Sequence, residues 1–331
     1  MNGIALAGAG WGGQGLLAAL LIQAGQMALV LLAAPLLVGI VRKAKARLQR
    51  RRGASVLQPY RDLRRLLGKE VVLAENASWL FRTAPYAIFA ATWVAAALVP
   101  TFATGLIFSW TGDLIVITAL LGGARFALAL AGMDIGTSFG GLGASREVMI
   151  ASLAEPAMLM LVFCVAIVAG STQLSSVAAY MLTQPVGLRV SLALALVALC
   201  IVAVAENGRV PVDNPATHLE LTMVHEAMVL EYSGRHLAMI ELASALKLLL
   251  FASLIGCLFF PFGLAHAGSA WTGYLLAIGL WCGKLLVMAG LLGTLELSIA
   301  KMRVFRVPNF LGAAFMFGLL GVLLLFVSRG M

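Results

Sequence analysis

Carboxylate side chains are the residues of this sequence best suited to do chemistry, because most of what surrounds them is apolar. Hydrophobic residues make up 62% of the 331, and only 14 residues are Asp or Glu. A charged group at membrane depth costs on the order of a few kcal/mol, so such groups are typical of ion pathways or of buried ion pairs. Seven acids are candidates for a proton or coupling path: Glu155, Glu206, Asp213, Glu220, Glu226, Glu231 and Glu241.

Most of these acids lie within residues 206–236, where acids outnumber the two arginines and where proline and asparagine interrupt the chain. Proline and asparagine at these positions predict broken helices and turns that line a hydrated cavity. Crowded carboxylates in a low dielectric raise one another's pKa, which suits them to carrying protons near neutral pH. Nearby cations and histidines would set the electrostatics of the acids: Arg146, Arg209, His218, His225 and Lys247. The alternative is a set of structural ion pairs without a transport role.

Two motifs resemble catalytic signatures but lack the residues that their chemistry needs. His225-Glu226 begins an H-E-x-x-H zinc pattern, but Val229 stands where the second histidine would be. Residues 8–13 spell G-x-G-x-x-G, but an apolar run follows them and the first acid of the chain is Asp62. We therefore expect neither a zinc protease nor a dinucleotide site.

The four cysteines also lack a metal-binding pattern. Cys164, Cys200, Cys257 and Cys282 all fall within predicted spans, without a C-x-x-C spacing among them. We interpret them as small apolar packing residues and expect no metal or cofactor on this chain. An electron carrier would then belong to a partner subunit.

Long apolar runs must position the polar groups. A helix needs about 20 apolar residues to cross the hydrocarbon core, and the mean hydropathy of the chain is +1.00. The runs are continuous rather than alternating, which favours helices. We predict an all-α integral membrane protein, with about eight transmembrane helices in a single polytopic domain over 1–331 and with broken or amphipathic helices in its cytoplasmic loops. The predicted spans lie near 15–41, 86–109, 112–132, 147–170, 186–205, 237–261, 271–293 and 309–328.

Basic residues indicate which ends of the spans face the cytoplasm. The polar connections 42–85, 206–236 and 294–308 hold 12, 2 and 3 Lys or Arg, and Arg146 brings that side to 18 of 23. The positive-inside rule places these connections in the cytoplasm and both termini outside. The expected location is the cytoplasmic (inner) membrane of a bacterium or an archaeon. The net charge of +9 follows from this bias and from anionic lipid headgroups, so nucleic acid is not an expected partner.

A short amphipathic helix is predicted within residues 57–70. Pro59 stands where a first helical turn tolerates proline. Leu63, Leu66 and Leu67 form an apolar stripe, which is typical of a helix that lies at the membrane face.

Three stretches resemble the membrane subunit 1 family of respiratory complex I. They are residues 57–70, the stretch from Gly143-Ala144-Ser145-Arg146 to Glu155, and the loop from Arg209-x-Pro-x-Asp213 to Glu231-Tyr232-Ser233-Gly234. The likeness covers nearly the whole chain in matching order, with eight spans.

Within that family, the chain is more similar to the hydrogenase branch, which includes the membrane subunits of formate hydrogenlyase and hydrogenase-4. The stretch Pro211-Val212-Asp213-Asn214-Pro215-Ala216 looks like that branch. Quinone-reducing members tend to carry Phe at the place of Val212 and Glu at the place of Ala216.

The resemblance implies a membrane anchor and proton- or ion-coupling subunit of an energy-converting nickel–iron hydrogenase or formate hydrogenlyase-like complex. Its partners would be a hydrogenase-like large subunit with the Ni-Fe centre, a small subunit with iron–sulfur clusters, and antiporter-like membrane subunits in the lipid bilayer. The acids named above would carry the coupling, and the predicted short helix would help to dock partners through Gln58, Asp62, Lys69 and Glu70. Two alternatives stay open: the subunit that forms the quinone site of respiratory complex I, and a purely structural membrane anchor.

Overall fold

The computed structural model describes residues 16–183, 190–213, 223–266 and 268–329. This part of the chain is built almost entirely of helices joined by short connections. The α-helices are α2 (Leu16–Leu48), α3 (Gln58–Leu67), α4 (Trp79–Leu98), α5 (Leu114–Asp134), α6 (Ser138–Ala169), α7 (Leu174–Thr183), α8 (Val190–Glu206), α9 (His225–Val229), α10 (Gly234–Leu258), α11 (Trp271–Ser298) and α12 (Val307–Arg329). The 3-10 helices η1 (Ile107–Thr111) and η3 (Val304–Arg306) and the strands β1 (Ala103–Thr104) and β2 (Ala265–His266) complete the described elements.

The predicted all-α membrane fold is confirmed. Each of the eight predicted spans coincides with a helix, namely α2, α4, α5, α6, α8, α10, α11 and α12. Among the described residues, six of these helices are long and apolar enough to cross a membrane. The other two are α8, with 17 residues, and α4, which carries Arg82 and Pro85 within its 20 residues. The number of eight spans therefore stays a prediction.

The helix that contains the fourth predicted span is longer than the span, since α6 starts at Ser138 whereas the predicted span begins near 147. Thr137 caps this helix by accepting a hydrogen bond from the Gly140 amide at 3.2 Å. The hydropathy pattern did not predict these first turns, because Arg146 and Glu147 lower the mean hydropathy of the segment. Both charges lie inside the helix, and Glu155 is about four to five turns from its start, at 3.6 residues per turn.

The second predicted span ends too late, since α4 stops at Leu98 rather than near 109. Pro100 follows, and proline cannot donate the amide hydrogen bond that would continue a helix. The chain then forms β1, which pairs in parallel with β2 far along the sequence, with Ala103 opposite Ala265. These residues connect helices and do not extend the span.

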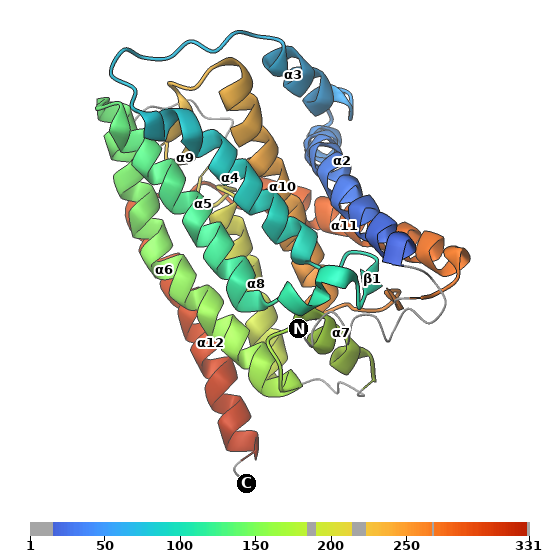
Figure 1. Cartoon of the computed structure of the whole chain (residues 1–331). Coiled ribbons are helices and arrows are strands. Elements are labelled where there is room, and N and C mark those ends of the chain that lie inside the picture. The colour runs from blue at the N-terminus through green and yellow to red at the C-terminus, as the bar shows by residue number, and fades with distance from the viewer. Residues whose placement is uncertain (1–15, 184–189, 214–222, 267, 330–331) are drawn as a thin grey trace.

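Six helices pack into one bundle in Figure 1: α4, α5, α6, α8, α10 and α12. Of the membrane-length helices, α10 is the most enclosed, and its Leu246, Leu249, Leu250 and Leu254 are almost fully buried. Helices α2 and α11 pack against each other beside this bundle, and α2 also contacts α10. Helix α10 is thus shared by the bundle and by the α2–α11 pair.

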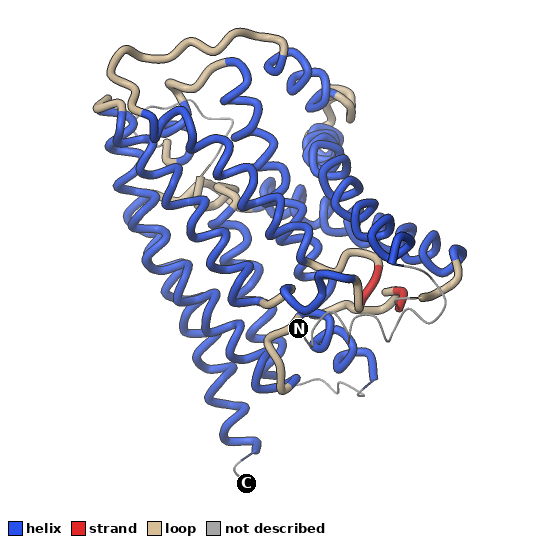
Figure 2. The backbone as a smooth tube through the Cα atoms, in the orientation of Figure 1, coloured by secondary structure: helices blue, strands red, loops and turns tan. Residues whose placement is uncertain are grey.

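The polar connections meet at one end of the molecule, which we call the α3 end because it contains α3, α9 and the loops before α4 and α12 (Figure 2). Ser233 Oγ accepts a hydrogen bond from the Val72 amide at 2.8 Å and donates one to the Val72 carbonyl at 2.9 Å. The Met302 amide donates to the Pro211 carbonyl at 2.8 Å. The three predicted connections therefore lie together, while their exposure to the cytoplasm stays a prediction.

Candidate functional site

Four charged side chains from α5, α6, α8 and α10 form a buried group that we call the Arg125 cluster: Arg125, Glu147, Glu206 and Lys247. Arg125 contacts Glu206 through Nη2, and its Nε lies 3.4 Å from Glu147 Oε1. Lys247 Nζ lies 3.9 Å from Glu206 Oε2. Two cations face two carboxylates, so the cluster is balanced in charge.

Burial makes the Arg125 cluster costly to disturb. The side chain of Arg125 is 4% exposed and that of Glu206 is 6% exposed. Removing one partner of such a pair costs about 3–5 kcal/mol, because the other charge is left buried and unpaired. Within the described residues, Glu206 Oε2 and Arg125 Nη1 are buried without a hydrogen-bond partner. The cluster thus keeps hydrogen-bonding capacity that its ion pairs do not use.

Asp213 forms a second buried contact seven residues after Glu206. Its Oδ1 lies 2.8 Å from Lys301 Nζ, and its Oδ2 accepts a hydrogen bond from the Val224 amide at 3.3 Å. Lys301 comes from the connection between α11 and α12, so this carboxylate joins three segments that are distant in the sequence.

Glu296 forms a third charged contact near the end of α11. Its Oε2 lies 2.6 Å from Lys45 Nζ on α2, and its Oε1 lies 3.3 Å from Arg209 Nη1. The Glu296 side chain is 1% exposed, so one buried carboxylate forms ion pairs with two cations. It ties α11 both to α2 and to the segment that follows α8.

His225 lies close to both the Arg125 cluster and Asp213. A small cavity of about 10 Å³ is lined by Glu147, Glu206, Asp213 and His225, and a cavity of this order holds about one water molecule. Burial lowers the pKa of His225, Lys247 lowers it further, and Glu147 and Asp213 oppose the shift. The imidazole is therefore neutral at pH 7 and able to accept a proton.

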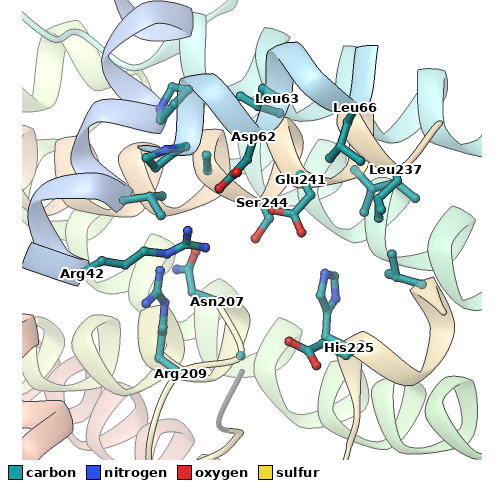
Figure 3. Close-up of a pocket in the computed structure, with 18 of the residues that line it drawn as sticks. Arg42, Asp62, Leu63, Leu66, Asn207, Arg209, His225, Leu237, Glu241 and Ser244 are labelled. Carbon is teal, nitrogen blue, oxygen red and sulfur yellow. The ribbon is translucent and has the colours of Figure 1, made fainter. Parts of the chain in front are cut away.

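A much larger cavity of about 640 Å³ lies at the α3 end among α2, α3, α9 and α10 (Figure 3). Asp213 and His225 line both this cavity and the small one, so these two side chains lie between the two cavities. Its size lies within the range of about 300–1,000 Å³ that is usual for ligand sites. The charged residues of its lining are Arg42, Lys45, Asp62, Arg65, Arg209, Asp213, Glu226 and Glu241.

The structure brings together most of the described acids that were predicted to form a path. Glu206 belongs to the Arg125 cluster, whereas Asp213, Glu226 and Glu241 line the larger cavity. The Glu155 carboxylate packs against Gly122 of α5 and lies close enough to Arg125 to interact with it electrostatically.

The remaining residues predicted to carry or support the path are more scattered. Glu231 is exposed between α9 and α10. Arg146 donates a hydrogen bond to the Met223 carbonyl at 2.8 Å, which fixes the chain just before α9. His218 and Glu220 lie outside the described residues.

The four residues predicted for partner docking lie in and after α3. Gln58 donates a hydrogen bond to Asp62 at 3.0 Å, and Asp62 lines the larger cavity. The carbonyl groups of Lys69 and Glu70 approach Gly234 so closely that a Cβ there would overlap them. This segment is exposed at the α3 end, and its docking role stays a prediction.

The sequence did not predict five residues of the Arg125 cluster and of the Asp213 and Glu296 contacts: Arg125, Glu147, Lys45, Glu296 and Lys301. Arg125 carried a usable signal, since a lone arginine within an apolar run of about 20 residues needs a buried acid as its partner. Glu296 looked like a loop residue because the predicted span ended at 293, whereas α11 continues to Ser298.

A family model described as NADH dehydrogenase matches residues 22–327, a range that contains all three charged contacts and the larger cavity. The chain belongs to the NADH dehydrogenase family. Formate hydrogenlyase subunit 4 of Escherichia coli (strain K12) is 36% identical over 294 residues, covering 88% of this chain and 94% of that protein. Hydrogenase-4 component C of the same strain is 35% identical over 241 residues, covering 73% of this chain and 75% of that protein.

The chain is also similar to a plant oxidoreductase chain and, in fold, to a chain of a solved membrane complex. NADH-ubiquinone oxidoreductase chain 1 of Triticum aestivum is 30% identical over 239 residues, covering 68% of this chain and 72% of that protein. A chain in the structure of the membrane-bound sulfane sulfur reductase, an archaeal respiratory membrane complex, shares the fold with a TM-score of 0.80. That match covers 93% of this chain and 99% of the other, at 20% identity. The predicted resemblance is confirmed, and the chain is a multi-pass membrane protein related to subunits of membrane complexes.

Proposed function

We propose that this protein is the membrane anchor and the proton- or ion-coupling subunit of an energy-converting nickel–iron hydrogenase or formate hydrogenlyase-like complex. Its α3 end would dock a hydrogenase-like large subunit and an iron–sulfur small subunit, which would hold the Ni-Fe centre and the clusters. Antiporter-like membrane subunits would be the neighbours within the bilayer. The names of its E. coli relatives support the kind of complex.

The observation that carries this proposal is the succession of buried polar groups from the Arg125 cluster to the α3 end. Glu206 and His225 line the same small cavity, and His225 also lines the larger one. A carboxylate, a neutral imidazole and space for about one water molecule are the parts from which proton relays are built. A change of charge on a docked partner would shift the proton affinity of these groups, because charges interact strongly in a low dielectric.

The test is Glu206→Gln in the purified complex, reconstituted into liposomes and driven with reduced methyl viologen. Hydrogen evolution is measured together with the internal pH of the liposomes. We expect evolution in the presence of an uncoupler to stay within about twofold of wild type, while proton movement per hydrogen falls about tenfold or more, the scale of a lost proton-transfer group.

Glu75→Gln is the matched control, because Glu75 is an exposed carboxylate at the same end of the molecule. If Glu206→Gln does not assemble, His225→Asn tests the same route at a group that is not ion-paired. Wild-type proton movement in an assembled variant of either residue would contradict the coupling role and favour the purely structural anchor.

A quinone-reducing role is the second candidate function, because the larger cavity also has apolar lining residues and the family includes a ubiquinone oxidoreductase chain. Turnover of the purified complex with a soluble quinone analogue, blocked by quinone-site inhibitors, would establish this role. Absence of turnover, together with hydrogen evolution, would support the hydrogenase role.

A further inference from the structure

Arg42 on α2 and Glu241 on α10 are opposite charges that face the larger cavity without meeting each other. Within the part of the chain that the structure describes, neither side chain takes part in a hydrogen bond or an ion pair. Figure 3 shows the Arg42 guanidinium directed towards that of Arg209, and the Glu241 carboxylate across the cavity beside Ser244. Two separated charges on opposite walls indicate an occupant with two charged ends.

The wall around Arg42 carries excess positive charge. Lys45 and Arg209 share the single carboxylate of Glu296, which does not itself line the cavity, and Arg42 adds a third cation to this part of the lining. Neighbouring guanidinium groups repel each other unless an anion lies between them, and their paired N–H donors match the oxygens of a phosphate.

The opposite wall carries negative charge and can accept hydrogen bonds. Glu241 lies there beside Ser244, while Asp62 of α3 lies between Arg42 and Glu241 in Figure 3. The Oδ1 atom of Asp62 accepts a hydrogen bond from Gln58 and lies 3.5 Å from the exposed Arg65. A primary ammonium group suits this wall, because it is a compact cation with three hydrogen-bond donors.

The rest of the lining is apolar and continues down α2. Pro35 and Val38 come from this helix, and Pro35 lies about 10 Å from Arg42 along the axis at 1.5 Å per residue. Leucines of α3 and α10 extend the apolar surface: Leu63, Leu66 and Leu237. A charged region followed by an apolar region matches the order of a lipid headgroup and its acyl chains.

We propose that this cavity binds an aminophospholipid of the phosphatidylethanolamine class. The phosphate lies between Arg42 and Arg209, the ammonium group lies against Glu241 beside Ser244, and an acyl chain follows Pro35 and Val38. Phosphatidylglycerol lacks the cation that Glu241 needs, and the quaternary ammonium of phosphatidylcholine has no hydrogen to donate. A quinone is uncharged and would pair with neither wall. This inference concerns the ligand of the cavity and does not rest on the proposed coupling role.

The test uses the full complex with its partner subunits in nanodiscs that contain equal amounts of palmitoyl-oleoyl phosphatidylethanolamine, phosphatidylglycerol and phosphatidylcholine. Lipids that stay bound after transfer to detergent are counted by mass spectrometry. For wild type we expect phosphatidylethanolamine to be enriched about tenfold over each of the other two, the effect of about one charge-assisted hydrogen bond. Arg42→Gln and Glu241→Gln should each abolish the enrichment.

Arg51→Gln and Glu75→Gln are matched controls, because they remove charges that do not line the cavity and should keep the enrichment. Phosphatidylglycerol enrichment that only Arg42→Gln removes would show a simple anion site and overturn the proposal. Retention of a quinone in place of phospholipid, or unchanged enrichment in both cavity variants, would also overturn it. The comparison of phosphatidylethanolamine with phosphatidylcholine in wild type decides the question even if a variant fails to assemble.

Discussion

Replacing Glu296 by glutamine should destabilise the junction of α2, α11 and the segment after α8. The carboxylate is 1% exposed, whereas its partners Lys45 and Arg209 are 25% and 15% exposed. Breaking a fully buried pair costs about 3–5 kcal/mol, and the partial exposure of the two cations lets water screen them, so we expect a loss of about 2 kcal/mol. At about 2 °C per kcal/mol for a chain of this size, the unfolding temperature should fall by about 4 °C.

The assay is thermal unfolding of the purified complex in detergent, followed by intrinsic fluorescence. Glu75→Gln, an exposed change of the same kind, should leave the unfolding temperature within about 1 °C of wild type, as surface substitutions usually do. Lys45→Met should cost less than Glu296→Gln, because the glutamate then keeps Arg209 as its partner. An unfolding temperature for Glu296→Gln equal to wild type would refute the reasoning that this carboxylate is paired and buried.

Three other expectations concern orientation, acid sensitivity and a buried amide. In intact cells, a membrane-impermeant thiol reagent should label Ser328→Cys but not Ser55→Cys; the reverse pattern would overturn the predicted orientation. The pKa of His225 is lowered in the folded state, so below about pH 6.5 the unfolded chain binds the proton first and stability falls as pH falls. His225→Asn should show a shallower fall in unfolding temperature between pH 7 and 5.5, and equal slopes would contradict this. Gln26 donates two buried hydrogen bonds to carbonyl groups at the end of α4, so Gln26→Leu should lower the free energy of unfolding by about 1–3 kcal/mol. The exposed Gln49→Leu should leave it unchanged, and equal unfolding temperatures for the two variants would contradict this role of Gln26.

The sequence predicts the membrane helices well because their signal is local. Every apolar run of sufficient length became a helix, and the amphipathic segment 57–70 became α3 at the same end as the acidic loop. Ends of helices were less predictable, as in α6, because a cap and a few glycines decide where hydrogen bonding starts while hydropathy averages over many residues.

Ion-pair partners could not be predicted, because they depend on which helices pack together. Nothing near Arg125 in the sequence points to Glu206, and Lys45 and Glu296 stand at opposite ends of the chain. Charge content therefore identified the acidic segment as a candidate site, but packing of α5, α8 and α10 decided which acids became buried pairs and which, like Glu231, stayed exposed.

The hydrogen bonds between Val72 and Ser233 give α3 a mechanical connection to the centre of the protein. Gly234, with φ of 53°, leaves no space between the start of α10 and the chain that leaves α3. A helix transmits a push along its axis, and Lys247 lies about 20 Å beyond Gly234 at 1.5 Å per residue. A partner that displaces α3 would therefore act on the start of α10, the helix that carries Lys247. The Lys247–Glu206 separation of 3.9 Å is at the outer limit of ion-pair contact. Movement of α10 along its axis would change this separation, and with it the charge pairing of Glu206 in the core.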